Sequence, residues 1–226
     1  MTVQEIVTRV RAAIDELMEN GSQFLGQSTD EANLTRVIVD KIGYALQHII
    51  ETAPLDRLGE EMIETLSSGE MAESFSIDSD LVGHLILPSS MLRLVEARLS
   101  SWSLFPIPEP DTSQVWLMQQ DQYARGSWDR PVNIITNTDG HRELLMYCAK
   151  QSNDKLQFAY IGRPNLTNVD ADHMSTNVSV PAQLQAALVY QVAGLTMVAF
   201  REDVAEALFN LAQRYLDYGP NNGNGA

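Results

Sequence analysis

The sequence predicts an α+β protein, in which a helical bundle made from the N- and C-terminal segments carries an inserted small antiparallel β subdomain. Both ends of the chain repeat apolar side chains at the three- and four-residue spacing of helices. Residues 131–161 instead alternate apolar and polar side chains, as strands do. The order is helices, then strands, then helices. Terminal helices cannot bury their apolar stripes alone, so packing them together leaves the β segment as an insertion.

The N-terminal part predicts three helices. Residues 3–19 form an amphipathic stripe, and a capping-box signature opens a second helix over residues 28–51. A third stripe predicts a helix over residues 54–66. The acidic, serine-rich stretch 70–80 is typical of a mobile loop. The helical domain is therefore expected to include residues 1–80.

The chain changes character at residue 81, where an apolar run begins that ends at a proline. Residues 92–99 fit either a strand or a helix. An Asn-Thr-Asp-Gly turn over residues 137–140 joins two apolar runs into a hairpin, and residues 155–161 add another alternating run. We expect an antiparallel meander in a β-rich insertion that spans residues 81–178.

The C-terminal part predicts two more helices. Residues 186–200 are apolar on almost every side, but 15 residues are too few for a membrane span, which needs about 20. We expect a buried central helix there, with no membrane contact. An amphipathic helix follows, so residues 179–218 complete the helical domain. The Gly- and Asn-rich tail at 219–226 is expected to be disordered.

Charge argues against simple nucleic-acid binding. The formal net charge is −15, from 30 acidic and 15 basic residues. Residues 1–80 alone contain 16 acidic against 5 basic side chains. Such a surface repels phosphates, since nucleic-acid affinity comes mainly from lysine and arginine contacts.

The residue types that carry catalysis do not form working patterns. None of the four histidines lies at metal-ligand spacing from another, and a single cysteine, Cys148, excludes an intrachain disulfide. Cys148 lies in an apolar run, as a structural cysteine does. Phosphate-loop, hydrolase and dinucleotide motifs are missing from the sequence. We therefore expect that the protein is not an enzyme and that it has no catalytic residue, no cofactor and no bound metal.

The order of segments resembles the head–tail connector, or adaptor, proteins of tailed phages. Members have an L-P-x-x-x-x-R-L-like strand, a tryptophan shortly after it, a proline that leads into a hairpin, a strand ending in an aromatic and a proline, and a C-terminal P-x-x-x-x-x-A-L helix before an acidic break. The matching segments here are residues 87–94, Trp102, Tyr123, residues 128–134, 139–140, 143–147 and 158–164, Pro181 to Leu188, and Glu202-Asp203. The resemblance covers residues 3–217.

The resemblance implies a non-enzymatic subunit of a ring in the virion neck, assembled in the host cytoplasm. It implies a homo-dodecamer that binds the portal and other neck or tail proteins, while double-stranded DNA passes through its channel without specific binding. The chain also resembles ring proteins from the necks of short-tailed, crAss-like phages. A tail terminator or another neck ring is an alternative position, and a small enzyme or ligand-binding module is the alternative from another class.

Two sets of residues are candidates for these roles. Large aromatics are common both at interface hot spots and in cores, so the tryptophans could form part of a subunit contact or fill their own core. Carboxylates along a DNA channel would avoid binding the passing phosphates. The candidates are Trp102, Trp116 and Trp128 for the subunit interface, and Glu60, Glu61, Glu64, Glu70 and Glu73 for an acidic channel or surface.

Overall fold

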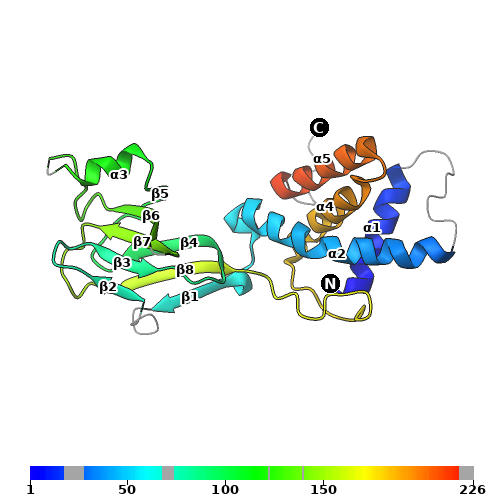
Figure 1. Cartoon of the computed structure of the whole chain (residues 1–226), viewed down its shortest axis with the longest axis horizontal. Coiled ribbons are helices and arrows are strands. Elements are labelled where there is room, and N and C mark those ends of the chain that lie inside the picture. Colours follow the sequence, from blue (N-terminus) through cyan, green and yellow to red (C-terminus); the bar gives the residue numbers. More distant parts are fainter. Residues whose placement is uncertain (18–27, 68–73, 122, 139, 219–226) are drawn as a thin grey trace. The chain divides into compact units, whose positions relative to one another are not determined.

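The computed structural model describes residues 1–17, 28–67, 74–121, 123–138 and 140–218. Its contacts divide the chain into two units (Figure 1). The helical unit contains the residues up to Glu60 and those from Arg163 onward, and the β unit lies between them, from Glu61 to Gly162. Helices and sheets are thus segregated along the chain, and the fold class is α+β as predicted.

The helical unit contains the helices expected from both ends of the sequence. Its elements are α1 (Val3–Leu17), α2 (Ser28–Thr52), the 3₁₀ turns η1 (Leu55–Arg57) and η3 (Ala182–Leu184), α4 (Gln185–Met197) and α5 (Glu202–Tyr218). The amphipathic α1 buries one stripe and exposes the other face, which confirms the helix predicted from residue 3. The predicted disorder of 219–226 lies outside the described residues.

Helix α4 is the centre of this unit and packs against α1, α2 and α5. Apolar residues around most of its circumference are buried, among them Leu188 and Val192, so the predicted central helix is confirmed. Gly194 lets α5 approach closely, because a Cβ there would lie 2.6 Å from the ring of Phe209. Within the described ranges, no helix has both the length and the apolar character needed to cross a bilayer.

Residues 163–178 belong to the helical unit, although the sequence analysis assigned them to the insertion. The Val3 amide donates to the Thr176 carbonyl at 3.0 Å, and the Val178 amide donates to the Met1 carbonyl at 2.7 Å. These backbone bonds fasten the segment to the start of α1. Polar, irregular residues gave no periodic signal for this, since the partner lies far away in the sequence.

The third predicted helix is wrong. After η1, the chain forms a second 3₁₀ turn, η2 (Glu60–Met62), and then strand β1 (Ile63–Ser67). Strand β1 pairs antiparallel with β8 (Leu156–Gly162), and Ile63 faces Ile161 in the register. The backbone ladder and the packing of Leu66 on the core outweigh the local helical spacing. Consequently the boundary between units falls at residue 60, not at residue 80.

Within the described ranges, the β unit contains two sheets (Figure 1). The first has strand order β1-β8-β4, and the second has order β2-β3-β7-β6-β5. The remaining elements of the unit are β2 (Phe75–Ile77), β3 (Gly83–Ile86), β4 (Met91–Leu99), β5 (Pro108–Pro110), α3 (Gln114–Gln119), β6 (Val132–Thr138) and β7 (His141–Tyr147). The ambiguous segment 92–99 is therefore a strand.

Both sheets contribute to one apolar core. Its buried members are Leu85, Leu87, Met91, Ala97, Leu99, Trp102, Leu144, Met146, Ala149, Leu156, Phe158 and Tyr160. Asn133 connects the sheets, because its buried Nδ2 donates to the Ala97 carbonyl at 2.9 Å. A sandwich-like arrangement of this kind buries the inward-facing residues of both sheets.

The predicted meander is only half right. Strands β6 and β7 form the expected hairpin, with Thr138 opposite His141. Strand β8, however, leaves that sheet and pairs with β1 and β4 in the other one. Its burial is nearly continuous rather than alternating, so it requires partners on both edges and cover on both faces.

Besides β1, strands β2 and β5 were not predicted either. Strand β2 lies in the stretch expected to be a mobile loop, and residues 70–73 of that stretch lie outside the described residues. Strand β5 contains Pro108 and Pro110 and pairs in parallel with β6 at the edge of its sheet. Prolines are tolerated there because an edge strand has one side without a ladder partner.

Candidate functional site

The three tryptophans of the chain converge on residues 147–150, where β7 ends. The Trp102 Nε1 donates to the Cys148 carbonyl at 3.0 Å. Trp116, on α3, lies close enough to Tyr147 to oppose the rise in the pKa of its hydroxyl. The Lys150 Nζ lies 4.6 Å from the centroid of the Trp128 ring, a cation–π contact. Segments far apart in the sequence thus build one site around the end of a central strand.

Trp102 is a core residue of the β unit, since its exposed fraction is 3%. This corrects its position among the candidate interface residues, because a side chain already covered by its own core cannot contact a neighbour. Trp116 is half-buried, and Trp128 is 47% exposed. The structure therefore leaves Trp116 and Trp128 as the tryptophans that a partner could reach.

Cys148 has the left-handed backbone angle φ of 73°, so the chain turns sharply as it leaves β7. Burial raises the pKa of the Cys148 thiol, and the nearby Arg125 opposes that rise. A raised pKa keeps the sulfur as a thiol at neutral pH. Burial likewise raises the pKa of Tyr147, against the opposing effect of Trp116.

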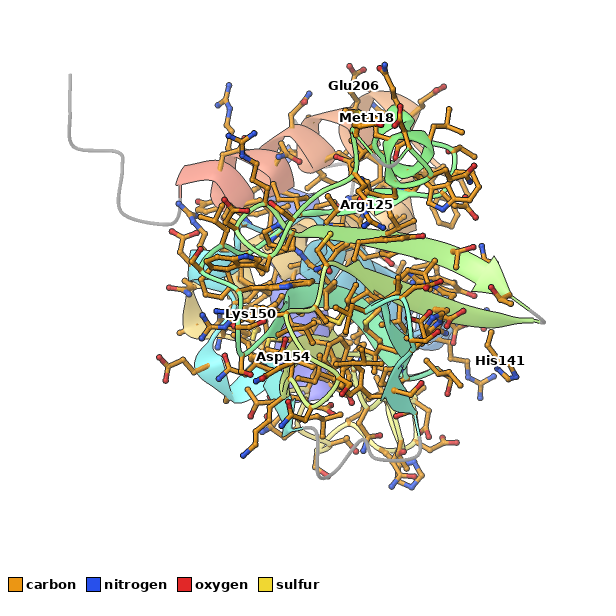
Figure 2. All side chains as sticks on the ribbon, turned by 90° about the vertical axis from the view of Figure 1, so that its left-hand side faces the viewer. Met118, Arg125, His141, Lys150, Asp154 and Glu206 are labelled. Carbon is orange, nitrogen blue, oxygen red and sulfur yellow. The ribbon has the colours of Figure 1, made fainter. Side chains whose placement is uncertain are left out.

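Asp154 holds the loop after β7 in place, although no sequence pattern marks this residue. Asp154 is 4% exposed. The Ser101 hydroxyl donates to it at 2.6 Å, and the Lys150 amide donates to it at 2.9 Å. The bonds explain how a charged group is tolerated at this depth. Figure 2 shows Lys150 and Asp154 on this loop.

A cavity of about 700 Å³ lies beside this loop and is called here the β7-end pocket. Its apolar wall includes Leu81, Val82, Ala149 and the Trp128 ring. Its charged rim contains two cations, Arg125 and Lys150, against one carboxylate, Asp80. Further lining comes from Gln119, Gly126, Ser127, Tyr147 and Cys148. A net positive pocket with an aromatic wall suits an anionic group attached to an apolar one.

Apolar side chains are exposed on the two segments that flank edge strand β5. Ile107 is 82% exposed, and Leu117 is 58% exposed. Figure 1 shows α3 beside β5 and β6. We name this set the edge surface; its members are Leu104, Phe105, Ile107, Leu117, Met118 and Tyr123. Large exposed apolar side chains on neighbouring segments are typical of a contact surface.

The acidic candidates have different surroundings. Glu60, Glu61 and Glu64 are exposed. Glu64 accepts a hydrogen bond from the Tyr160 hydroxyl at 2.6 Å, and burial together with Glu64 raises the pKa of Tyr160. Glu64 therefore has a structural partner. The remaining two candidates, Glu70 and Glu73, lie outside the described residues.

His84 forms a second polar cluster in the β unit, also missed in the sequence. Its Nδ1 lies 2.8 Å from a Glu143 oxygen, and its Nε2 lies 3.2 Å from an Asp78 oxygen. Burial lowers the pKa of His84, but the two carboxylates outweigh burial and raise it above 6.5. Among the residues that the structure describes, no three His, Cys, Asp or Glu side chains are grouped to hold a metal ion.

Comparison with known proteins identifies no relative: no family model matches the chain, and no curated protein matches it.

Proposed function

We propose that the chain is a subunit of a ring in the neck of a tailed phage, between portal and tail. The resemblance of its segment order to head–tail connector proteins supports this proposal, and the edge surface is the structural observation that carries it. Prolines in β5 discourage pairing with another strand, so a partner would bind there through side chains. Side-chain contacts of this type allow a rigid, specific subunit contact.

Ring closure requires two different surfaces on each subunit, because neighbours related by rotation meet head-to-tail. In this proposal the edge surface is one of them. The helices from both chain ends form the bundle that makes the body of the subunit. The expected assembly is a dodecamer that binds the portal.

The test is the mass of the purified chain, alone and with a portal. We expect a ring-sized oligomer by native mass spectrometry and a ring in cryo-electron microscopy. Replacing Leu117 and Met118 by Asp should block assembly and preserve the fold, since both side chains are exposed. The matched control is Tyr44→Asp, which changes an exposed apolar residue of the helical unit. A chain that stays monomeric in both settings would overturn the proposal.

Exposed carboxylates would keep passing DNA from binding to the ring. Glu60→Lys with Glu61→Lys should retain DNA in the particle and slow ejection, while assembly is unchanged. Asp15→Lys with Glu16→Lys changes the same charge on α1 and is the control. Ejection at the normal rate with the first variant fully incorporated would limit these residues to solubility.

The β7-end pocket favours one other function, a binding module for a small anionic molecule. Its volume lies within the range of about 300–1,000 Å³ that is common for ligand sites. Saturable binding of such a molecule by a monomeric chain would support this module in place of the ring.

A further inference from the structure

We infer that the β7-end pocket receives the turn between α4 and α5 from a second copy of this chain. The inference rests on the proposed ring and names the two surfaces that would meet in it. The acidic turn is defined here as residues 198–206, which include the start of α5; its proposed contact side chains are Val198, Phe200, Glu202 and Glu206. Pocket and turn are two different surfaces of each subunit, as head-to-tail contact requires, and they belong to different units.

The acidic turn has the two properties that would suit the pocket, which are exposed apolar side chains and negative charge. Val198 is 55% exposed and Phe200 is 49% exposed, so two apolar side chains project where the helices meet. Backbone bonds hold the turn: the Phe200 and Arg201 amides donate to the Met197 carbonyl at 2.9 and 2.8 Å. Exposed apolar groups on a braced turn lose little conformational freedom when they bind.

Charge on the turn is negative in spite of its arginine. The guanidinium of Arg201 contacts the Asp203 carboxylate at 2.7 and 3.0 Å, and this pair has no net charge. Glu202 and Glu206 are exposed and four residues apart, so they lie on the same side of α5. The turn therefore presents two carboxylates beside its apolar side chains.

The pocket offers the complement of each group. The Phe200 ring would pack against the Trp128 ring in the apolar wall of the pocket, because aromatic rings pack favourably on one another. Glu202 and Glu206 match Arg125 and Lys150 on the rim, which outnumber Asp80. The chain has a net charge of −15, so two copies generally repel each other. A net positive pocket would instead attract an acidic segment of a second copy.

Continuity with the edge surface supports the same partner. Gln119 at the end of α3 lines the pocket, and Leu117 and Met118 immediately precede it. The loop from Arg125 to Trp128 follows Tyr123 of the edge surface closely. Apolar side chains would surround the charged contact and exclude water from it, an arrangement found at interface hot spots.

Charge reversal and its repair test the contact. Arg125→Glu with Lys150→Glu, and separately Glu202→Lys with Glu206→Lys, should each weaken assembly at least about tenfold, measured by sedimentation over a concentration series. The chain carrying all four changes should assemble again, since each reversed pocket then meets a reversed turn. Arg142→Glu with Lys155→Glu reverses two exposed cations of the same unit and should assemble normally.

Rings that survive both reversals would overturn this inference and leave the ring proposal intact. Lack of any oligomer in the wild-type chain, alone or with a portal, would overturn both. Failure of the fourfold variant to recover while its fold is unchanged, judged by circular dichroism, also counts against the contact.

Cross-linking gives an independent measurement. Cys148 is the single cysteine and lines the pocket, and Ala199 is exposed in the turn. A short bis-maleimide added to the Ala199→Cys variant should produce a ladder of linked chains, because each subunit then has one thiol on each surface. The same variant with Cys148→Ser should give no ladder. A link within one chain, or no link, would contradict docking between copies.

Discussion

The helical unit and the β unit bury their apolar residues in different ways. In the helical unit, α4 is enclosed by α1, α2 and α5, and its core depends almost entirely on apolar packing. In the β unit, two sheets share a core whose connections depend on buried polar groups such as Asn133 and Asp154. The β unit also has the larger set of exposed aromatic and aliphatic side chains.

This difference indicates that the two units use their apolar side chains for different purposes. The apolar surface of an enclosed helix is buried within its own unit and stabilises that unit. The side chains that are exposed around β5 and α3 remain available for a partner. All three tryptophans belong to the β unit, so their fluorescence reports that unit while helical ellipticity mainly reports the other. The two units can therefore be perturbed and measured separately.

The largest effect is expected in the centre of α4. Leu188 is fully buried, and Leu188→Ala should lower the free energy of unfolding of the helical unit by about 2–5 kcal/mol. Chemical denaturation followed by ellipticity should show the loss, while the tryptophan transition moves little. Tyr44→Ala, at an exposed site on α2, should change neither. Equal shifts of both transitions would mean that the units unfold together and would break the comparison.

Asp154→Ala should destabilise the β unit by about 1.5–3 kcal/mol, because donors from Ser101 and from the loop lose a charged acceptor. Denaturation followed by tryptophan fluorescence measures this effect. Asn153→Ala changes the exposed neighbour and is the control. If the two variants are equally stable, the polar connections do not distinguish the β unit from the helical one.

His84→Gln should make the stability of the β unit less dependent on pH. The folded pKa of His84 is raised, so its contribution is complete below the unfolded value of about 6.5 and is lost as pH rises through the folded pKa. The pKa of Asp78 is lowered, because its hydrogen bonds outweigh burial, so its contribution disappears in acid below about pH 4.

The measurement compares unfolding midpoints of wild type and His84→Gln at about pH 5.5 and pH 8.5. The variant should lose more stability at the lower pH. His141→Gln, which changes an exposed histidine of β7 (Figure 2), is the matched control. A larger loss at the higher pH would contradict the assignment of the ion pairs.

The smallest effect concerns the acidic residues. Glu64→Gln should cost about 0.5–1.5 kcal/mol through its bond with Tyr160, whereas Glu61→Gln, which leaves that bond in place, should cost almost nothing. Spectrophotometric titration should also show the pKa of Tyr160 falling toward its ordinary value in Glu64→Gln. Equal behaviour of the two variants would mean that the bond between Glu64 and Tyr160 adds nothing to stability.

Several features followed from the sequence alone. The α+β class, α1, α2, α4 and α5, and the β6–β7 hairpin could be predicted, since each depends on spacing along a short stretch of chain. The enclosed position of α4 could also be predicted, because a helix that is apolar all round must be covered on every side.

Tertiary structure decided the rest. β1 is a strand because its backbone pairs with β8. β8 is not in the sheet of the β6–β7 hairpin, because its buried residues need a paired strand on each side, and β1 and β4 are those strands. The pocket gathers side chains from the β2–β3 turn, α3 and the end of β7, which no local pattern connects. Contacts between distant residues determine such features, and their energies exceed the small preferences that a single segment has by itself.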